Sequence, residues 1–380
     1  MQNVDTYMKP IYKAIEYATD TSHITNYNWK ETLKDRTVVA FGLGKFFEDT
    51  HERLFSMIDI AYLCDNNECL WGGDRYGKKI LSPDEMKNIE NVFVIIVMGN
   101  PLAVMEQLKR RGVEYIHISE LHFSYYEKGT DTAWLTDSKE KIQNALALLQ
   151  DDKSREIFTK VFCNKIYLSH SDHEYHSFQE GGEYFENGLW TLGEDECFLD
   201  GGAYIGDTID DFINKTNHRY EKIYSFEYEK DNYDVLQRRI REAYFAEMNK
   251  IELYNVGIWD KEDKGYCVYF GESDGTQIVS DAATNQNAQQ CQLDALDHVL
   301  EGKRISVLKL DIEGAEINGL NGAKNIITRQ KPKLAICLYH RPEDLWEIPC
   351  LIHEMNPAYK MIIKHHSMAN FTDTVLYAVS

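Results

Sequence analysis

The sequence is poor in basic residues and has no hydrophobic run long enough to cross a membrane. Its 380 residues include 41 Lys and Arg against 62 Asp and Glu, a net charge of −21. A surface of that sign repels nucleic-acid phosphates and anionic lipid headgroups, so neither nucleic acid nor a membrane is an expected partner. The longest apolar runs, such as residues 92–98, fall far short of the ~20 residues that a bilayer requires. The first residues also lack the basic-then-apolar pattern of a secretory signal, and we expect a cytoplasmic location.

Paired cysteines of the kind that hold structural zinc are also missing. Of the eight cysteines only Cys64 and Cys69 lie close together, and a lone pair with that spacing matches no zinc motif. We therefore predict no structural zinc site. The composition is 43% hydrophobic and 27% charged, which is typical of globular proteins, and the length suits about two domains.

Four segments follow one another along the chain. Residues 1–31 carry apolar side chains at helical spacing, which predicts a helical lead-in. Residues 32–122 alternate strand, turn and helix patterns, which predicts a smaller Rossmann-like α/β domain. Residues 123–190 are predicted to form a helical connector, and strand–helix alternation resumes over residues 191–380.

The last segment predicts a seven-stranded sheet. Its candidate strands are residues 196–200, 222–227, 251–259, 305–311, 333–339, 360–366 and 374–380. The loop between the last two is too short for a parallel crossover, so they are expected to form an antiparallel hairpin. Six parallel strands with one antiparallel strand resemble the sheet of the class I S-adenosylmethionine-dependent methyltransferases, and we expect that α/β fold.

The sharpest local signal is a strand that runs into a glycine turn and then a helix, FLDGGAYIGDT at residues 198–208. Glycine lets a ligand approach the backbone, and the free amides of a helix start favour a carboxylate or phosphate. Asp200, at the strand tip, could take the ammonium group of a methionine-like ligand. Glu227 ends the next strand, where an acidic side chain can accept hydrogen bonds from two ribose hydroxyls. Together they indicate a nucleoside site, although any doubly wound sheet needs a tight turn after its first strand.

The spacing of the glycines in this turn distinguishes between two candidate cofactors. Asp200-x-Gly202-x-x-x-Gly206 departs from the Gly-x-Gly-x-x-Gly fingerprint of dinucleotide sites. The turn therefore favours S-adenosylmethionine over NAD.

The second half of the chain, about residues 180–380, resembles the FkbM family of methyltransferases. The matching stretches are EYF, FLDGGAYIGDT, FE, LKLDIEGAE, YHRPEDLWEIP, KHHS and TVLYA, in chain order. The family is described as S-adenosylmethionine-dependent, with a class I fold, and as methylating mainly hydroxyl groups of natural products and glycans. The resemblance therefore implies O-methylation of a small-molecule or glycan acceptor.

The resemblance also implies roles for single residues. Those that would hold the cofactor are Asp200, Gly202, Ala203 and Gly206 at its amino-acid end, Glu227 at the ribose and Tyr228 beside the adenine. Two places depart from the family pattern, the doubled glycine at residues 201–202 and the tandem His365–His366, of which the resemblance favours His365.

Four polar side chains lie where predicted strands end, at the rim where open α/β sheets bind ligands. They are Asp311, Glu313, His340 and His365 or His366. Methyl transfer requires alignment of the acceptor and removal of a hydroxyl proton, and a histidine near its normal pKa suits a general base. We expect His340 to be that base. The same donor set would suit a divalent cation, and Asp311 and Glu313 could instead cap the following helix.

The 32–122 segment carries a weaker motif. Residues 42–44 are Gly-Leu-Gly, Asp65 follows the next strand, and Phe47 stands where a dinucleotide fingerprint has its third glycine. This pattern predicts either a nucleotide or nucleotide-sugar site or a turn kept without a ligand, with a role in acceptor recognition or homo-oligomerisation. Two alternatives to methyl transfer stay open: a non-catalytic nucleotide-binding or scaffold protein, and an NAD-dependent oxidoreductase or epimerase run by this segment.

Overall fold

The structure is a computed structural model of the chain. It describes residues 4–19, 33–98, 101–118, 133–167, 182–185, 188–269, 276–279, 289–366 and 373–380. Parts of the predicted connector, residues 123–132 and 168–181, therefore lie outside the described residues. No helix in the described ranges is both long and apolar enough to span a membrane.

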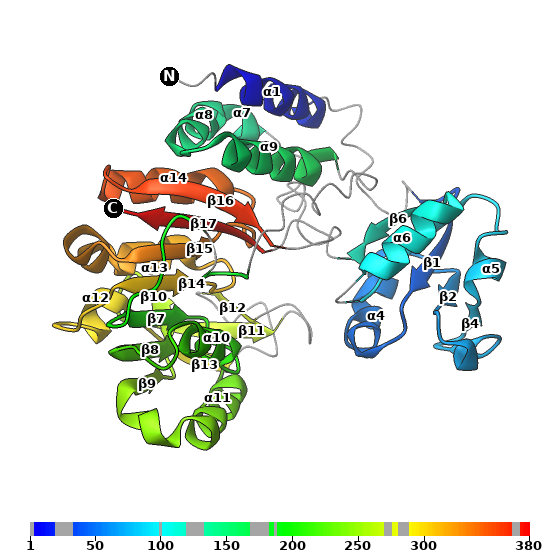
Figure 1. Ribbon diagram of the computed structural model, residues 1–380. Helices are drawn as coiled ribbons and strands as arrows, with labels where there is room; N and C mark the ends of the chain where they lie inside the picture. Colours follow the sequence, from blue (N-terminus) through cyan, green and yellow to red (C-terminus); the bar gives the residue numbers. More distant parts are fainter. Residues whose placement is uncertain are drawn as a thin grey trace.

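The early part of the chain forms a six-stranded sheet with helices on both faces (Figure 1). Its elements are β1 (Thr37–Phe41), α4 (Lys45–Met57), β2 (Tyr62–Cys64), β3 (Asp74–Arg75), β4 (Lys78–Leu81), α5 (Pro83–Met86), β5 (Val92–Ile96), α6 (Leu102–Arg111) and β6 (Glu114–His117). The strand order is β3-β4-β2-β1-β5-β6, and every pair is parallel except β3 with β4. The predicted parallel α/β pattern is confirmed here.

A seven-stranded sheet organises the rest of the chain. Its strands and helices are β7 (Cys197–Gly201), α10 (Asp207–Lys215), β8 (Lys222–Phe226), α11 (Lys230–Ala243), β9 (Ile251–Tyr254), β14 (Val307–Leu310), α13 (Glu316–Gly322), β15 (Lys333–Cys337), α14 (Asp344–Met355), β16 (Lys360–His365) and β17 (Thr374–Val379). The strand order is β16-β17-β15-β14-β7-β8-β9. Only β17 runs antiparallel to its neighbours, so the predicted hairpin of the last two strands is confirmed.

One predicted strand is wrong, because residues 251–259 divide between two sheets. The chain leaves the large sheet at Asn255, whose side-chain amide donates to the carbonyl oxygens of Glu227 and Tyr228, at 2.9 and 3.0 Å. The next strand belongs to an unpredicted four-stranded sheet of order β10-β13-β11-β12. Its elements are β10 (Gly257–Trp259), β11 (Asp263–Tyr269), β12 (Thr276–Val279) and β13 (Gln289–Ala295), followed by α12 (Leu296–Val299).

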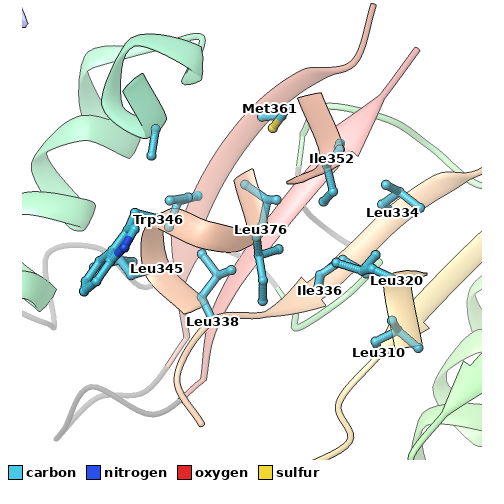
Figure 2. Close-up of a cluster of buried hydrophobic side chains, with 14 of the residues drawn as sticks. Leu310, Leu320, Leu334, Ile336, Leu338, Leu345, Trp346, Ile352, Met361 and Leu376 are labelled. Carbon is cyan, nitrogen blue, oxygen red and sulfur yellow. The ribbon is translucent and has the colours of Figure 1, made fainter. Parts of the chain in front are cut away.

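Side chains of the large sheet alternate between two cores, as the period of a strand requires. In β7, Phe198 packs on the side of α10 and α11, whereas Leu199 joins the larger core under α13 and α14. Figure 2 shows part of that larger core, in which Trp346 of α14 lies beside Leu345. Burial on both faces identifies the strand ends as the place where the sheet can bind a ligand.

We call the six-stranded sheet with its helices the first body and the seven-stranded sheet with its helices the second body. The lead-in helix and the connector helices belong to the second body. They are α1 (Asp5–Thr19), α7 (Ala133–Asp137), α8 (Lys139–Leu148) and α9 (Asp152–Tyr167). α1 packs against α9, and Ile11 and Ile15 share a core with Phe158 and with β16 (Figure 1). α9 also covers the sheet edge, since the Ser154 hydroxyl accepts the Ile363 amide at 2.9 Å. A covered edge cannot pair with another chain.

Candidate functional site

The glycine turn after β7 depends on glycine for steric reasons. Gly202 has a φ of +76°, and a Cβ there would lie 1.7 Å from the carbonyl oxygen of Asp311. The amides of Gly202 and Ala203 donate to the Phe226 carbonyl at 3.1 and 3.0 Å, which ties the turn to β8. Gly206, with a φ of +93°, starts α10. The predicted turn residues are thus brought together at the carboxyl end of β7.

Beneath the turn lies a buried ion pair. Asp200 is fully buried, and the Lys309 ammonium lies 3.1 Å from its Oδ1 while donating to the Gly202 carbonyl at 2.7 Å. Burial raises the pKa of Asp200, with Lys309 acting in the opposite direction. Asp200 was expected to take the ammonium group of a ligand, but the structure gives it an ammonium group of the protein. Its contact with a cofactor stays a prediction.

Glu227 links the turn to the end of β8. Its two carboxylate oxygens accept the amides of Tyr204 and Glu229 at 2.9 and 2.8 Å. Burial raises the pKa of Glu227 to about 7, although these amides favour the ionised form. A carboxylate has about four acceptor positions, so two remain for a ligand. Tyr228 follows directly, and its position beside an adenine stays a prediction.

Asp311 leads a polar cluster at the end of β14. Its carboxylate accepts the Tyr184 hydroxyl at 2.9 Å and the Tyr339 hydroxyl at 3.0 Å. Burial works to raise the pKa of Asp311, but nearby cations and these two hydroxyls outweigh it and lower that pKa. The N-cap of α13 is Ala315, with no side-chain cap hydrogen bond, so Asp311 does not cap that helix.

His340 lies among three carboxylates. Nδ1 donates to Glu316 at 2.8 Å, while Nε2 lies 3.4 Å from Asp311 and 3.5 Å from Glu313. Burial opposes the imidazolium, but the three carboxylates outweigh it and raise the pKa of His340 to about 10. The raised pKa favours the protonated ring, which cannot accept a proton, and the expected role of His340 as the general base stays a prediction.

The two adjacent histidines after β16 point to different surroundings. His365 is fully buried and its Nδ1 lies 2.8 Å from the Thr374 hydroxyl. His366 Nε2 lies 2.8 Å from the Tyr377 hydroxyl, which also accepts the Tyr184 amide at 2.9 Å. Burial lowers the pKa of His366 to about 4. Of the pair, His366 rather than the favoured His365 therefore connects to the residues around Asp311.

Sequence reasoning missed four residues of this cluster, namely Lys309, Glu316, Tyr184 and Glu183. Glu316 is fully buried at the start of α13. Burial raises the pKa of Glu183 to about 8. The family-like stretches EYF and LKLDIEGAE contain all four, so that resemblance was the signal that could have identified them.

The turn after β1 is hydrogen-bonded like the turn after β7. Asp65 accepts the amides of Leu43 and Asn67, at 2.7 and 2.8 Å. Phe47 is fully buried in the core. A nucleotide at this turn remains a prediction.

Comparisons with known proteins find a family model and several solved structures. Residues 200–368 match the family model described as the methyltransferase FkbM domain. The crystal structure of methyltransferase FkbM from Methylobacillus flagellatus KT is 21% identical, with a TM-score of 0.71 over 99% of this chain and 100% of that chain. A putative methyltransferase from Streptococcus mutans in complex with SAH is more distant, at 10% identity and a TM-score of 0.31 over 50% of this chain and 91% of that chain. No curated protein matches.

The match to the Methylobacillus flagellatus structure shows that the two chains share a fold along their length.

Proposed function

Because residues 200–368 form a methyltransferase FkbM domain, we propose that the protein transfers a methyl group from S-adenosylmethionine to a hydroxyl group of a small-molecule or glycan acceptor. The observation that carries this proposal is the Glu227 carboxylate. It keeps two acceptor positions beside a glycine turn, and, unlike Asp65 after β2, it shares that sheet edge with the hydroxyl-bound Asp311 carboxylate after β14.

The residues at the carboxyl ends of β7 and β8 fit the cofactor. Two vicinal ribose hydroxyls match the two remaining acceptor positions of Glu227, and the backbone of residues 202–206 leads into the start of α10. When bound, S-adenosylmethionine supplies the sulfonium methyl group. The protein supplies the turn that places it and the neighbouring strand end that places the acceptor.

The acceptor side of the proposal is the Asp311 cluster. β14 pairs with β7, and Asp311 follows β14 directly, so the backbone of Asp311 lies against the glycine turn. The pKa of Asp311 is lowered, and its carboxylate is held by two tyrosine hydroxyls, so it is an ionised acceptor for a hydrogen bond from a hydroxyl. Glu313, with 37% of its side chain exposed, extends the same carboxylate surface toward solvent.

Calorimetric titration of the full chain with S-adenosylhomocysteine tests the proposal without knowledge of the acceptor. We expect one-to-one binding that Glu227→Ala weakens by about tenfold or more, because charge-assisted hydrogen bonds are lost. The matched control is Asp65→Ala, which removes the corresponding carboxylate from the turn after β1.

Two results would count against this function. One is a folded protein without measurable binding, which would favour the scaffold alternative. The other is equal weakening by Asp65→Ala, which would remove the assignment of the ribose to Glu227. Stabilisation by NAD but not by S-adenosylhomocysteine would instead support the oxidoreductase alternative.

A further inference from the structure

We propose that His340, Asp311 and Glu313 form a binding site for a divalent cation, with Glu316 as the residue that orients the histidine. The site lies at the end of β14, where Tyr184 and Tyr339 also bind Asp311. Its use in catalysis rests on the proposed methyl transfer, but cation binding itself does not.

The first argument is an unsatisfied nitrogen. His340 has 3% of its side chain exposed, and its Nε2 is buried without a hydrogen-bond partner. The nearest carboxylate oxygens, of Asp311 and Glu313, are 3.4 and 3.5 Å away, which is long for a hydrogen bond. A buried polar atom without a partner is costly. A cation between the nitrogen and the two carboxylates would satisfy all three donor atoms.

The second argument is the way in which the histidine is held. Histidines that bind metals usually donate their other ring N–H to a carboxylate, which fixes the ring and its tautomer. His340 Nδ1 has that bond, at 2.8 Å to Glu316, and the same Glu316 oxygen accepts the Ile312 amide at 2.9 Å. The ring is therefore fixed with Nε2 directed at Asp311 and Glu313.

Glu316 is close enough to be considered a ligand as well. Donor atoms of Asp311, Glu316 and His340 all lie within 4.8 Å of one another. One Glu316 oxygen already accepts two hydrogen bonds, and its side chain is fully buried. Glu313 Oε2 lies 3.5 Å from Nε2, whereas Glu316 bonds to Nδ1, so we assign Glu313 as the third ligand and Glu316 as the orienting residue.

The charge of the cluster agrees with a cation. Asp200 is neutralised by Lys309, which leaves Asp311, Glu313 and Glu316 around one imidazole. A proton and a metal ion are alternative occupants of Nε2, since a ligating histidine must be unprotonated.

The donor set indicates which ions the site would hold. One imidazole and two carboxylates suit Mn²⁺, Fe²⁺ or Zn²⁺ better than Ca²⁺, which prefers oxygen ligands alone. Three protein ligands leave positions for water or for an acceptor hydroxyl. A hydroxyl bound to a divalent cation has a lowered pKa, so a cation here would remove the need for His340 as a base.

Titration of the metal-stripped full chain with Mn²⁺, followed by electron paramagnetic resonance, tests the site directly. We expect one Mn²⁺ per chain, with binding weakened by at least about tenfold in His340→Gln and in Glu313→Gln. The partly exposed Glu313 side chain makes the second variant the safer one for folding. The matched control is His298→Gln, which removes an exposed histidine paired with Asp294 at 2.9 Å, outside the cluster.

Calorimetry with S-adenosylhomocysteine on the same samples separates the two proposals. A protein that binds this ligand but no stoichiometric Mn²⁺, or that binds Mn²⁺ equally well in His340→Gln and Glu313→Gln, overturns the cation site. Loss of Mn²⁺ binding in His298→Gln alone also overturns it. His340-dependent Mn²⁺ binding without S-adenosylhomocysteine binding leaves the cation site standing and removes the proposed function.

Discussion

The turns after β1 and after β7 have the same hydrogen bonds but different surroundings. In each turn, a carboxylate that follows the neighbouring parallel strand accepts two backbone amides. One amide belongs to the turn, and the other belongs to the residue two positions after the carboxylate. The carboxylate is Asp65 in the first body and Glu227 in the second. These bonds tie the first strand to the second, so they belong to the architecture of the turn.

The two turns differ in the strand that pairs with the opposite edge of β7 or of β1. This strand is β14 in the second body and β5 in the first. Asp200 of β7 is paired in register with Lys309 of β14, whereas Ala40 of β1 is paired with Ile95 of β5. The residue directly after β14 is Asp311, whereas the residue directly after β5 is the buried Val97. A glycine turn of this kind therefore does not by itself identify a catalytic site. The polar residues of the adjacent strand distinguish the candidate site.

The largest expected effect comes from breaking the buried pair that only the second body has. Lys309→Met leaves Asp200 buried without its cation, and we expect a loss of about 3–5 kcal/mol in the free energy of unfolding, measured by urea denaturation. The double variant Asp200→Ala/Lys309→Ile copies the Ala40–Ile95 pair of the first body. It should recover most of that loss, and a double variant as unstable as Lys309→Met would contradict this account of the pair.

A smaller effect is expected from adding a methyl group to each turn. Gly206→Ala, at the N-cap of α10, places a Cβ 2.8 Å from Leu236 Cδ1 at a φ of +93°, and we expect a loss of about 2 kcal/mol. Gly44→Ala meets no atom within 4 Å and has a φ of −79°, so its cost should stay below about 1 kcal/mol. Thermal denaturation of both variants measures the contrast, and equal losses would show that the turns are under the same steric constraint.

The smallest expected effect is a pH dependence of ligand affinity. Burial raises the pKa of Glu227 to about 7, and only its ionised form offers all its acceptor positions to ribose hydroxyls. Binding therefore favours proton release, and affinity for S-adenosylhomocysteine should fall by about tenfold between pH 8 and pH 6. Calorimetry across this range measures it. Glu227→Gln should abolish the dependence, and a dependence that persists in that variant must come from another group.

The sequence predicts those features whose cause is local. The β16–β17 hairpin follows from a short loop between two apolar runs, and the turn after β7 follows from its glycines. The division of residues 251–259 has a cause far along the chain, because Asn255 binds the backbone at Glu227 and Tyr228. An apolar pattern carries no information about such a partner.

The sequence predicted three residues that meet at the site, but not their partners or their protonation. Asp311, Glu313 and His340 do meet, as strand-end positions indicated. The charge of His340 depends also on Glu316, and Asp311 is held by Tyr184, 127 positions away in the sequence. From the sequence, Lys309 is expected to face solvent, since lysine is rarely buried without a partner. Its partner Asp200 could not be identified without the strand register.

The packing of α1 on α9 shows that the second body contains segments from both sides of residues 33–118. Residues 33–118 stand between two segments, α1 and α7, that contact each other and share one core with the seven-stranded sheet. The first body is therefore an insertion into the second, not an appendage at its start. The entropy cost of a long excursion grows only slowly with its length, so the host fold can tolerate a whole domain at this point. Exchange or deletion of that domain would then leave the order of the host's own elements intact.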